Sequence, residues 1–145
     1  MNKKNKNQKA ASMQMSVKFN KFAQRNSKDF KNFVNSIVER QTNFCITNME
    51  GGIEFAYNMH RRIVWENFKS LMESAGLIRE SKEEGRVYFG NAANVEFITH
   101  IVKTAAMLAY GKICQMSNCE PCKSEREELV ESVSRNCMLH TLRNA

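Results

Sequence analysis

The chain has 145 residues, a net charge of +7 and an apolar fraction of 42%. This length and composition are typical of one domain with a substantial core, and no run of about 18 apolar residues predicts a membrane span. The five cysteines are an odd number, and no apolar stretch follows the N-terminal lysines, so we expect no secretory signal. These features predict an intracellular protein with reduced thiols, in the cytoplasm, the nucleus or a virion, and without a membrane partner.

Positive charge is concentrated at the N-terminus. Residues 1–28 contain eight basic side chains and no acidic one, whereas the other 117 residues contain 14 basic and 15 acidic side chains. The basic residues of this arm are Lys3, Lys4, Lys6, Lys9, Lys18, Lys21, Arg25 and Lys28. Such an arm on a near-neutral body is typical of phosphate binding, because each neutralised phosphate releases condensed counterions. Since its first part is polar and low in complexity, we expect residues 1–27 to form a disordered basic arm. A short helix over 16–26, through Val17, Phe19 and Phe22, is the alternative for its second part.

Helical periodicity begins after Ser27, a plausible N-cap. Apolar residues recur there at i, i+3, i+4, i+7 and i+8, which predicts a helix over about 28–42. A short helix is expected over 43–50, followed by a turn at Gly51-Gly52. A longer helix is predicted over 53–75, and the glycine that follows it is expected to end it.

The period then changes to that of strands. Residues 77–80 and 86–89 are short strand-like runs, and the charged segment 81–85 between them predicts a hairpin loop. A helix, a turn, a longer helix and a hairpin follow one another in a winged helix-turn-helix body, which we expect over 28–90.

In this interpretation the helix 53–75 enters the major groove. The candidate base-reading residues are Asn58, Arg61 and Arg62, because Arg can address guanine and Asn can address adenine. The hairpin would contribute phosphate contacts from Arg79, Lys82 and Arg86.

The C-terminal part predicts two helices, over about 94–113 and 125–142. Ser124 and Glu127 form an S-x-x-E capping box at the start of the second helix. Helices joined by a short loop pack antiparallel, so residues 91–145 are expected to form a helix hairpin within one helical domain, 28–145. This hairpin would place Cys114 near Cys122.

Four C-terminal residues have the spacing of a zinc site. Cys119-x2-Cys122 and Cys137-x2-His140 together resemble a Cys₃His ligand set. A continuous last helix would instead hold Cys137 about 18 Å from its start, at about 1.5 Å per residue. We therefore expect no four-ligand zinc site within one chain, and we expect His100 to lie near Cys137 and His140 at the far end of the hairpin.

The predicted fold is mainly α with one small β-hairpin, and no catalytic set stands out, so we expect a protein that is not an enzyme and carries no cofactor. The favoured function is non-catalytic nucleic-acid binding, with DNA favoured over RNA, through the basic arm and a winged-helix-like body. Two alternatives remain open. The first is a self-assembling, viral capsid-like or nucleoprotein-like homo-oligomer whose arm contacts nucleic acid. The second is a zinc-binding protein that uses the C-terminal Cys/His set.

Overall fold

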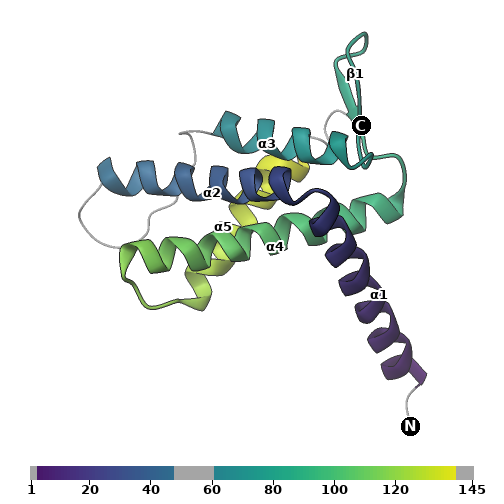
Figure 1. Cartoon of the computed structure of the whole chain (residues 1–145), viewed down its shortest axis with the longest axis horizontal. Helices are drawn as coiled ribbons and strands as arrows, with labels where there is room; N and C mark the ends of the chain where they lie inside the picture. Colours follow the sequence, from purple (N-terminus) through teal and green to yellow (C-terminus); the bar gives the residue numbers. More distant parts are fainter. Residues whose placement is uncertain (1–2, 48–60, 140–145) are drawn as a thin grey trace.

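The computed structural model describes residues 3–47 and 61–139, and there it is mainly helical with one two-stranded hairpin. This confirms the mainly α character and the small β-hairpin of the predicted fold, whereas the winged helix-turn-helix arrangement stays a prediction. The elements in chain order are α1 (Lys3–Arg25), α2 (Ser27–Thr47), α3 (Arg61–Ser74), β1 (Arg79–Ser81), β2 (Arg86–Tyr88), α4 (Ala92–Ser117), α5 (Lys123–Ser134) and the π-helical turn η1 (Arg135–Leu139) (Figure 1).

The expected disorder of the arm is wrong for residues 3–25, which form α1. The second half of this helix is anchored, because Phe22 is buried and Met15 and Phe19 pack against the core. Once an anchored turn exists, each further residue adds a hydrogen bond at a small entropic cost. The polar first half contains no glycine or proline, so nothing in its sequence stops the helix from continuing.

Helix α2 is longer than expected. It follows a turn at Asn26, whose side-chain amide donates to a carbonyl of α1 at 3.0 Å, and it continues to Thr47. The separate short helix predicted over 43–50 is therefore wrong for residues 43–47, which extend α2. Because no glycine or proline occurs between Ser27 and Thr47, the backbone has no reason to break there.

Helix α3 ends where the sequence predicts. Gly76 has φ of +71°, and the N–H of Leu77 donates to the carbonyl of Met72 at 2.9 Å, which is the usual left-handed end of a helix.

The beginning of the predicted helix 53–75, and the turn at Gly51-Gly52, lie outside the described residues.

Helices α2 and α3 lie side by side and run in opposite directions (Figure 1).

The predicted hairpin is confirmed. Strands β1 and β2 are antiparallel, and Glu80 pairs with Val87 at the middle of the register. The charged loop between them reverses the chain through Gly85, whose φ is +64°. Among the hairpin side chains that the structure describes, only Val87 is buried, and the hairpin extends from the body as a small appendage (Figure 1).

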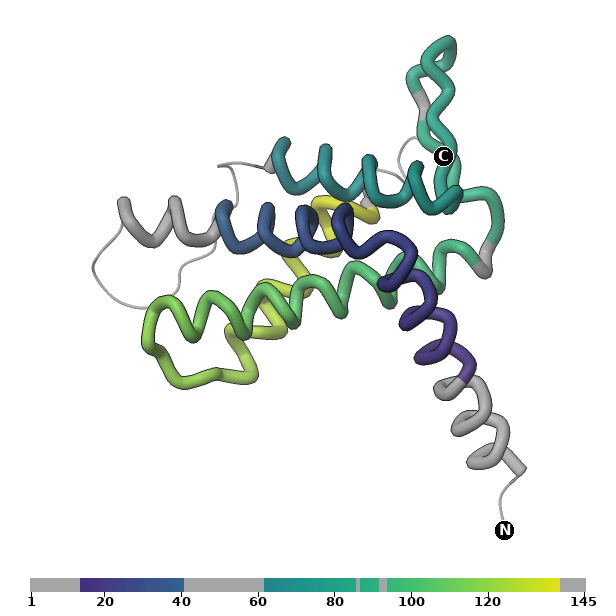
Figure 2. The backbone as a smooth tube through the Cα atoms, viewed as in Figure 1, coloured from purple at the N-terminus to yellow at the C-terminus, as the bar shows by residue number. Residues whose placement is uncertain are grey.

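The predicted antiparallel pair of C-terminal helices is confirmed, but the second helix is shorter than expected. A continuous helix was predicted over 125–142, whereas α5 ends at Ser134 and the π-helical turn η1 follows it. Helix α4 is capped by Asn91, whose side chain accepts the N–H of Asn94 at 3.0 Å, and it ends at Asn118 with φ of 55°. Helix α5 then returns along α4 in the opposite direction (Figure 1). The loop that joins them lies at the end of α4 away from the β-hairpin (Figure 2).

The predicted capping box is wrong. The N-cap of α5 is Cys122, and Ser124 lies within the first turn. The backbone N–H of Cys122 donates to the Tyr110 hydroxyl at 2.9 Å, which fixes the chain direction before Ser124 is reached. The helix therefore begins two residues earlier than the S-x-x-E pattern indicates.

The core is formed by the apolar stripes of α2 and α4, closed by α3 and α5. The residues of these stripes that are less than 2% exposed are Phe33, Ile37, Ile98, Ile101, Val102, Ala105, Ala106 and Ala109. Three of the eight are alanines on α4, where small side chains let neighbouring helices approach closely.

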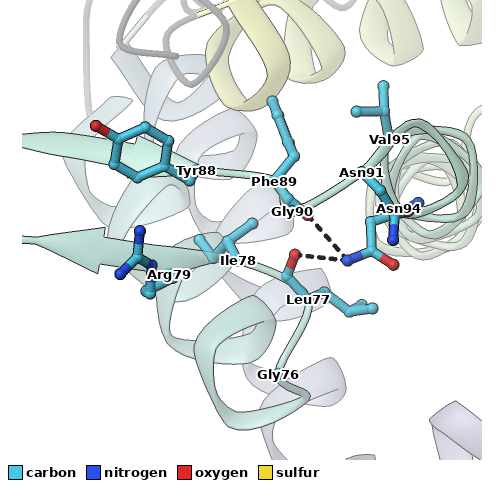
Figure 3. A pocket seen from close by; sticks show the side chains of 10 residues that line it. All are labelled: Gly76, Leu77, Ile78, Arg79, Tyr88, Phe89, Gly90, Asn91, Asn94 and Val95. Carbon is cyan, nitrogen blue, oxygen red and sulfur yellow. Dashed lines mark hydrogen bonds between the residues drawn. The ribbon is translucent and has the colours of Figure 1, made fainter.

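The base of the β-hairpin is tied to α4 by one side chain. The Asn94 amide nitrogen donates to the Leu77 carbonyl at 3.3 Å and to the Phe89 carbonyl at 2.9 Å (Figure 3). Replacing Asn94 by Ala leaves both partly buried carbonyls without this donor. We expect the free energy of unfolding to fall by about 1–3 kcal/mol, measured by urea denaturation.

A matched variant separates the donor from side-chain size. Asn94→Asp preserves the size but points carboxylate oxygens at two carbonyls, so it is expected to destabilise at least as much as Asn94→Ala. An Asp variant as stable as the wild type would contradict this role of the amide.

Candidate nucleic-acid interface

Three basic side chains line one face of the second half of α1. Lys18, Lys21 and Arg25 follow the spacing i, i+3 and i+7, which places them on one side of a helix, and all three are exposed. We call these three residues the basic ridge. No acidic residue occurs anywhere in α1, so the helix offers them no internal ion pair.

The basic ridge is fixed to the body of the protein by an aromatic side chain of α4. The Lys18 ammonium lies 4.3 Å from the centroid of the Phe97 ring, within the range of a cation–π contact. The Phe22 ring meets the same Phe97 ring edge-on at 5.7 Å. The position of the ridge relative to α4 is therefore set by buried aromatic packing rather than by exposed polar contacts.

A cavity of about 460 Å³ runs beside the ridge. Its lining residues are Lys18, Lys21, Phe22, Arg25, Asn26, Ser74, Ala75, Leu77 and Phe97. The C-terminal ends of α1 and α3 both reach this cavity, and helix C-termini carry partial negative charge. Arg25 lies in the last turn of α1 and stabilises that end. An anion is accordingly favoured on the outer, solvent side of the ridge rather than inside the cavity.

The ion pairs of the structure leave the ridge available. Within residues 3–47 and 61–139, ion pairs form between Arg62 and Glu66, Lys69 and Glu80, and Arg135 and Glu131. None of these three pairs involves a ridge cation, so the described acidic residues do not neutralise the ridge by direct contact.

The other basic residues of the arm are placed less fully. The backbones of Lys3, Lys4, Lys6 and Lys9 belong to α1, and their side chains lie outside the described residues. Lys28 is exposed in the first turn of α2.

The candidate base-reading residues are not gathered into a free basic surface. Asn58 lies outside the described residues, as does the side chain of Arg61 at the first position of α3. Arg62 donates to Glu66 at 2.9 Å across one helical turn. Its side chain is 88% exposed, so this pair is weak. The described solvent face of α3 is close to neutral, with Glu73 adding a further negative charge.

The hairpin is likewise balanced in charge. The Arg79 guanidinium lies over the Tyr88 ring at 5.3 Å, and the Tyr88 hydroxyl donates to Glu84. Lys82 is exposed in the loop, and Arg86 belongs to β2 with its side chain outside the described residues. Acidic neighbours therefore accompany the cations that were expected to contact phosphate.

A second cavity, of about 610 Å³, lies at the base of the hairpin (Figure 3). Its walls come from the end of α3, both strands and the first turn of α4. The Asn94 amide that reaches its wall is already engaged by two backbone carbonyls. The cavity lies where the hairpin meets α4, and the Asn94 amide holds these two elements together.

The structure does not bring the candidate zinc ligands together. Cys119 and Cys122 lie before α5, Cys137 lies in the turn after it, and His140 lies outside the described residues. The 12 residues of α5 span about 18 Å at about 1.5 Å per residue. Among the described residues, no group of three or more potential ligands is close enough to hold a metal ion.

His100 has a neighbour that the sequence did not predict. Its ring meets the Phe19 ring edge-on at 5.5 Å, so it faces α1. The antiparallel geometry of the helix hairpin alone suggested Cys137 and His140 as its neighbours, and His140 lies outside the described residues.

Sequence reasoning missed Tyr110, which links the two ends of the α4–α5 loop. This side chain is 2% exposed, its hydroxyl accepts the Cys122 N–H, and it also bonds the Cys114 side chain. Burial raises the pKa of Tyr110. The available signal was its place one turn before Cys114 on the apolar side of α4.

Comparison with known proteins finds no matching family, no matching curated protein and no matching solved structure. In the part of the chain that the structure describes, no helix is both long enough and apolar enough to cross a membrane.

The buried thiol of Cys137 makes the free energy of unfolding depend on pH in the alkaline range. Burial raises the pKa of its thiol far above the ordinary value, and the charge of the buried Arg40 opposes this only in part. An unfolded chain ionises this thiol near pH 8.5, whereas the folded chain holds it neutral. The stabilisation is thus complete below about pH 8.5 and is lost at higher pH, with a limiting slope of about 1.4 kcal/mol per pH unit.

Cys137→Ala removes this titration. We expect the stability difference between wild type and variant, measured by urea denaturation under reducing conditions, to be constant at pH 7–8 and to shrink between about pH 9 and 10.5. A difference that stays constant to pH 10.5 would show that the folded thiol ionises like an exposed one.

Proposed function

We propose that this protein binds nucleic acid without catalysing a reaction, and that the basic ridge of α1 makes its main phosphate contacts. The observation that carries this proposal is the alignment of Lys18, Lys21 and Arg25 on one exposed face with no acidic residue in the same helix. The rest of the protein holds α1 in place but adds little net charge, since its basic and acidic side chains nearly balance.

The geometry of the ridge suits a duplex. Seven residues of helix separate Lys18 from Arg25, or about 10 Å at about 1.5 Å per residue. Duplex DNA carries one negative charge per about 1.7 Å of its axis, so a ridge of this length faces several phosphates at once.

DNA is favoured over RNA because the ridge is presented on an α-helix. The major groove of B-DNA, about 12 Å wide, admits an α-helix, whereas the major groove of A-form RNA is too deep and narrow for side chains to read. The exposed Asn20 and Gln24 on α1 are of the residue types that address adenine.

A winged-helix mode is the second way in which this body can meet DNA. It is supported by the order of α3, the Gly76 turn and the hairpin. Because the charges on α3 and on the hairpin nearly balance, we expect this mode to contribute less to the affinity for DNA than α1 does. In this mode Arg61, Arg62 and Lys82 are auxiliary contacts.

Removing the ridge charges should weaken binding and its salt dependence together. The triple variant Lys18→Gln, Lys21→Gln and Arg25→Gln removes three charges and keeps helix-forming side chains. We expect affinity for a duplex DNA of about 20 base pairs to fall at least about tenfold, and the slope of log K against log salt to flatten by about 2–3. Fluorescence anisotropy titrations at several salt concentrations measure both.

The matched control removes the same net charge elsewhere. Lys103, Lys112 and Lys123 are exposed on α4 and α5, and their change to Gln should leave the slope nearly unchanged. Equal losses in both variants would mean that only net charge matters, and unchanged binding in the ridge variant would refute the proposal. Circular dichroism confirms that each variant is folded, and parallel titrations with duplex RNA and single strands test the preference for DNA.

Self-assembly is the second candidate function, and an exposed apolar surface favours it. On α4, Met107, Leu108 and Met116 are 49%, 50% and 64% exposed, and Ala106 and Ala109 on either side of the first two are buried. If this surface binds a second copy of the chain, sedimentation velocity will detect a dimer that Leu108→Glu converts to a monomer. A wild-type protein that is monomeric throughout the micromolar range would exclude this function.

A further inference from the structure

The loop between α4 and α5 carries two accessible cysteines in a Cys-x-x-Cys arrangement. Cys119 follows the left-handed Asn118 and is exposed, whereas Cys122 is half-buried as the N-cap of α5. Only Glu120 and Pro121 separate them. Both are free thiols, and the spacing allows their sulfurs to meet through rearrangement of the short loop alone.

Cys122 has the surroundings of a reactive thiolate. Its sulfur lies 3.2 Å from the Ser124 hydroxyl at the beginning of a 12-residue helix. Its side chain forms no standard N-cap hydrogen bond, yet it remains close to the first backbone N–H groups of α5. The Ser124 hydroxyl, followed by the N–H groups of Glu125 and Ser124, lowers the pKa of Cys122. A helix N-terminus favours the negative charge of a thiolate for the same reason.

The neighbouring cysteines differ in ways that separate their roles. The sulfur of Cys119 donates to the Ser117 carbonyl at 3.4 Å and remains exposed, so it is accessible to attack a bond at Cys122. Cys114 is 4% exposed and bonds to the Tyr110 hydroxyl, beneath the loop. The accessible pair is thus 119 and 122, and the buried thiol lies below it.

We propose that Cys119 and Cys122 form a redox-active dithiol that exchanges with small-molecule disulfides, with Cys122 as the nucleophile and Cys119 as the resolving thiol. The Cys122 thiolate attacks one sulfur of a disulfide RSSR, forms a mixed disulfide and releases RS⁻. The Cys119 thiol then loses its proton to solvent, attacks the Cys122 sulfur and expels the second RS⁻. The protein dithiol loses two electrons, and RSSR gains them to become two RSH after protonation.

Oxidised glutathione is the probe for this exchange, applied to the full-length reduced protein. After free thiols are blocked by alkylation, cleavage after Lys112 and Lys123 releases one peptide, 113–123, that contains Cys114, Cys119 and Cys122. We expect this peptide to carry an internal disulfide, seen as two unblocked cysteines and the loss of two hydrogens, in the wild type and in Cys114→Ala. We expect a trapped glutathione adduct at Cys122 in Cys119→Ser. In Cys114→Ala only Cys119 and Cys122 remain in the peptide, so this variant excludes a bond from Cys114.

Alkylation rates test whether Cys122 is more nucleophilic than an ordinary exposed thiol. At pH 7, iodoacetamide should alkylate Cys122 in Cys119→Ser at least about threefold faster than Cys119 in Cys122→Ser. Ser124→Ala, added to Cys119→Ser, should reduce that advantage and raise the pH at which alkylation reaches half its maximal rate. This pH shift is a readout that a purely structural role of Ser124 would not move.

Three outcomes would overturn the proposal. Equal alkylation rates would remove the role of Cys122 as the favoured nucleophile. An internal disulfide in peptide 113–123 of the wild type that is absent from Cys114→Ala would mean that Cys114 is one of its two cysteines. Oxidation that gives only intermolecular dimers would mean that the loop does not close.

Discussion

The packing of α2 against α4 is the constraint on which the rest of the structure depends. Both helices bury continuous apolar stripes, and Ala105, Ala106 and Ala109 on α4 leave room for close approach. The apolar stripe on each of these helices is wider than the surface that the other helix covers. Helix α3 therefore closes the far side of α2, and α5 closes the far side of α4. Burial at about 25 cal/mol per Å² makes this shared interface the dominant favourable contribution to folding.

The same packing determines where the charge is displayed. Phe97 belongs to the buried stripe of α4, and its ring also contacts Phe22 and the Lys18 ammonium. Helix α1 is thereby held by aromatic contacts, and its exposed basic ridge lies directly beside them. A charged helix held in this way loses less conformational entropy on binding than a disordered arm, because much of the ordering cost is met during folding.

The sequence predicts the helices better than their ends. Periodicity located α2, α4, α5 and the end of α3, because apolar spacing and the Gly76 turn are local signals. Periodicity missed the full length of α1, whose Phe22 is buried against Phe97 of α4. The predicted beginning of α5 was also wrong, because the Tyr110 hydroxyl fixes the chain before Ser124. The features of the candidate sites were likewise predicted only in part. The basic residues were evident from composition, whereas the pairing of Arg62 with Glu66 and the surroundings of Cys122 depend on three-dimensional contacts.

The basic ridge and the Cys119–Cys122 dithiol lie toward opposite ends of α4 (Figure 2). Seventeen residues of that helix separate Phe97, beside the ridge, from Cys114, below the loop, or about 25 Å at about 1.5 Å per residue. The Debye length at physiological ionic strength is about 8 Å, so the charge of a thiolate at Cys122 is screened before it reaches the ridge. Oxidation of the dithiol can therefore alter nucleic-acid affinity only by moving α4 or its neighbours. Since the Phe97 face of α4 is locked in the core, the two surfaces should respond independently to substitution.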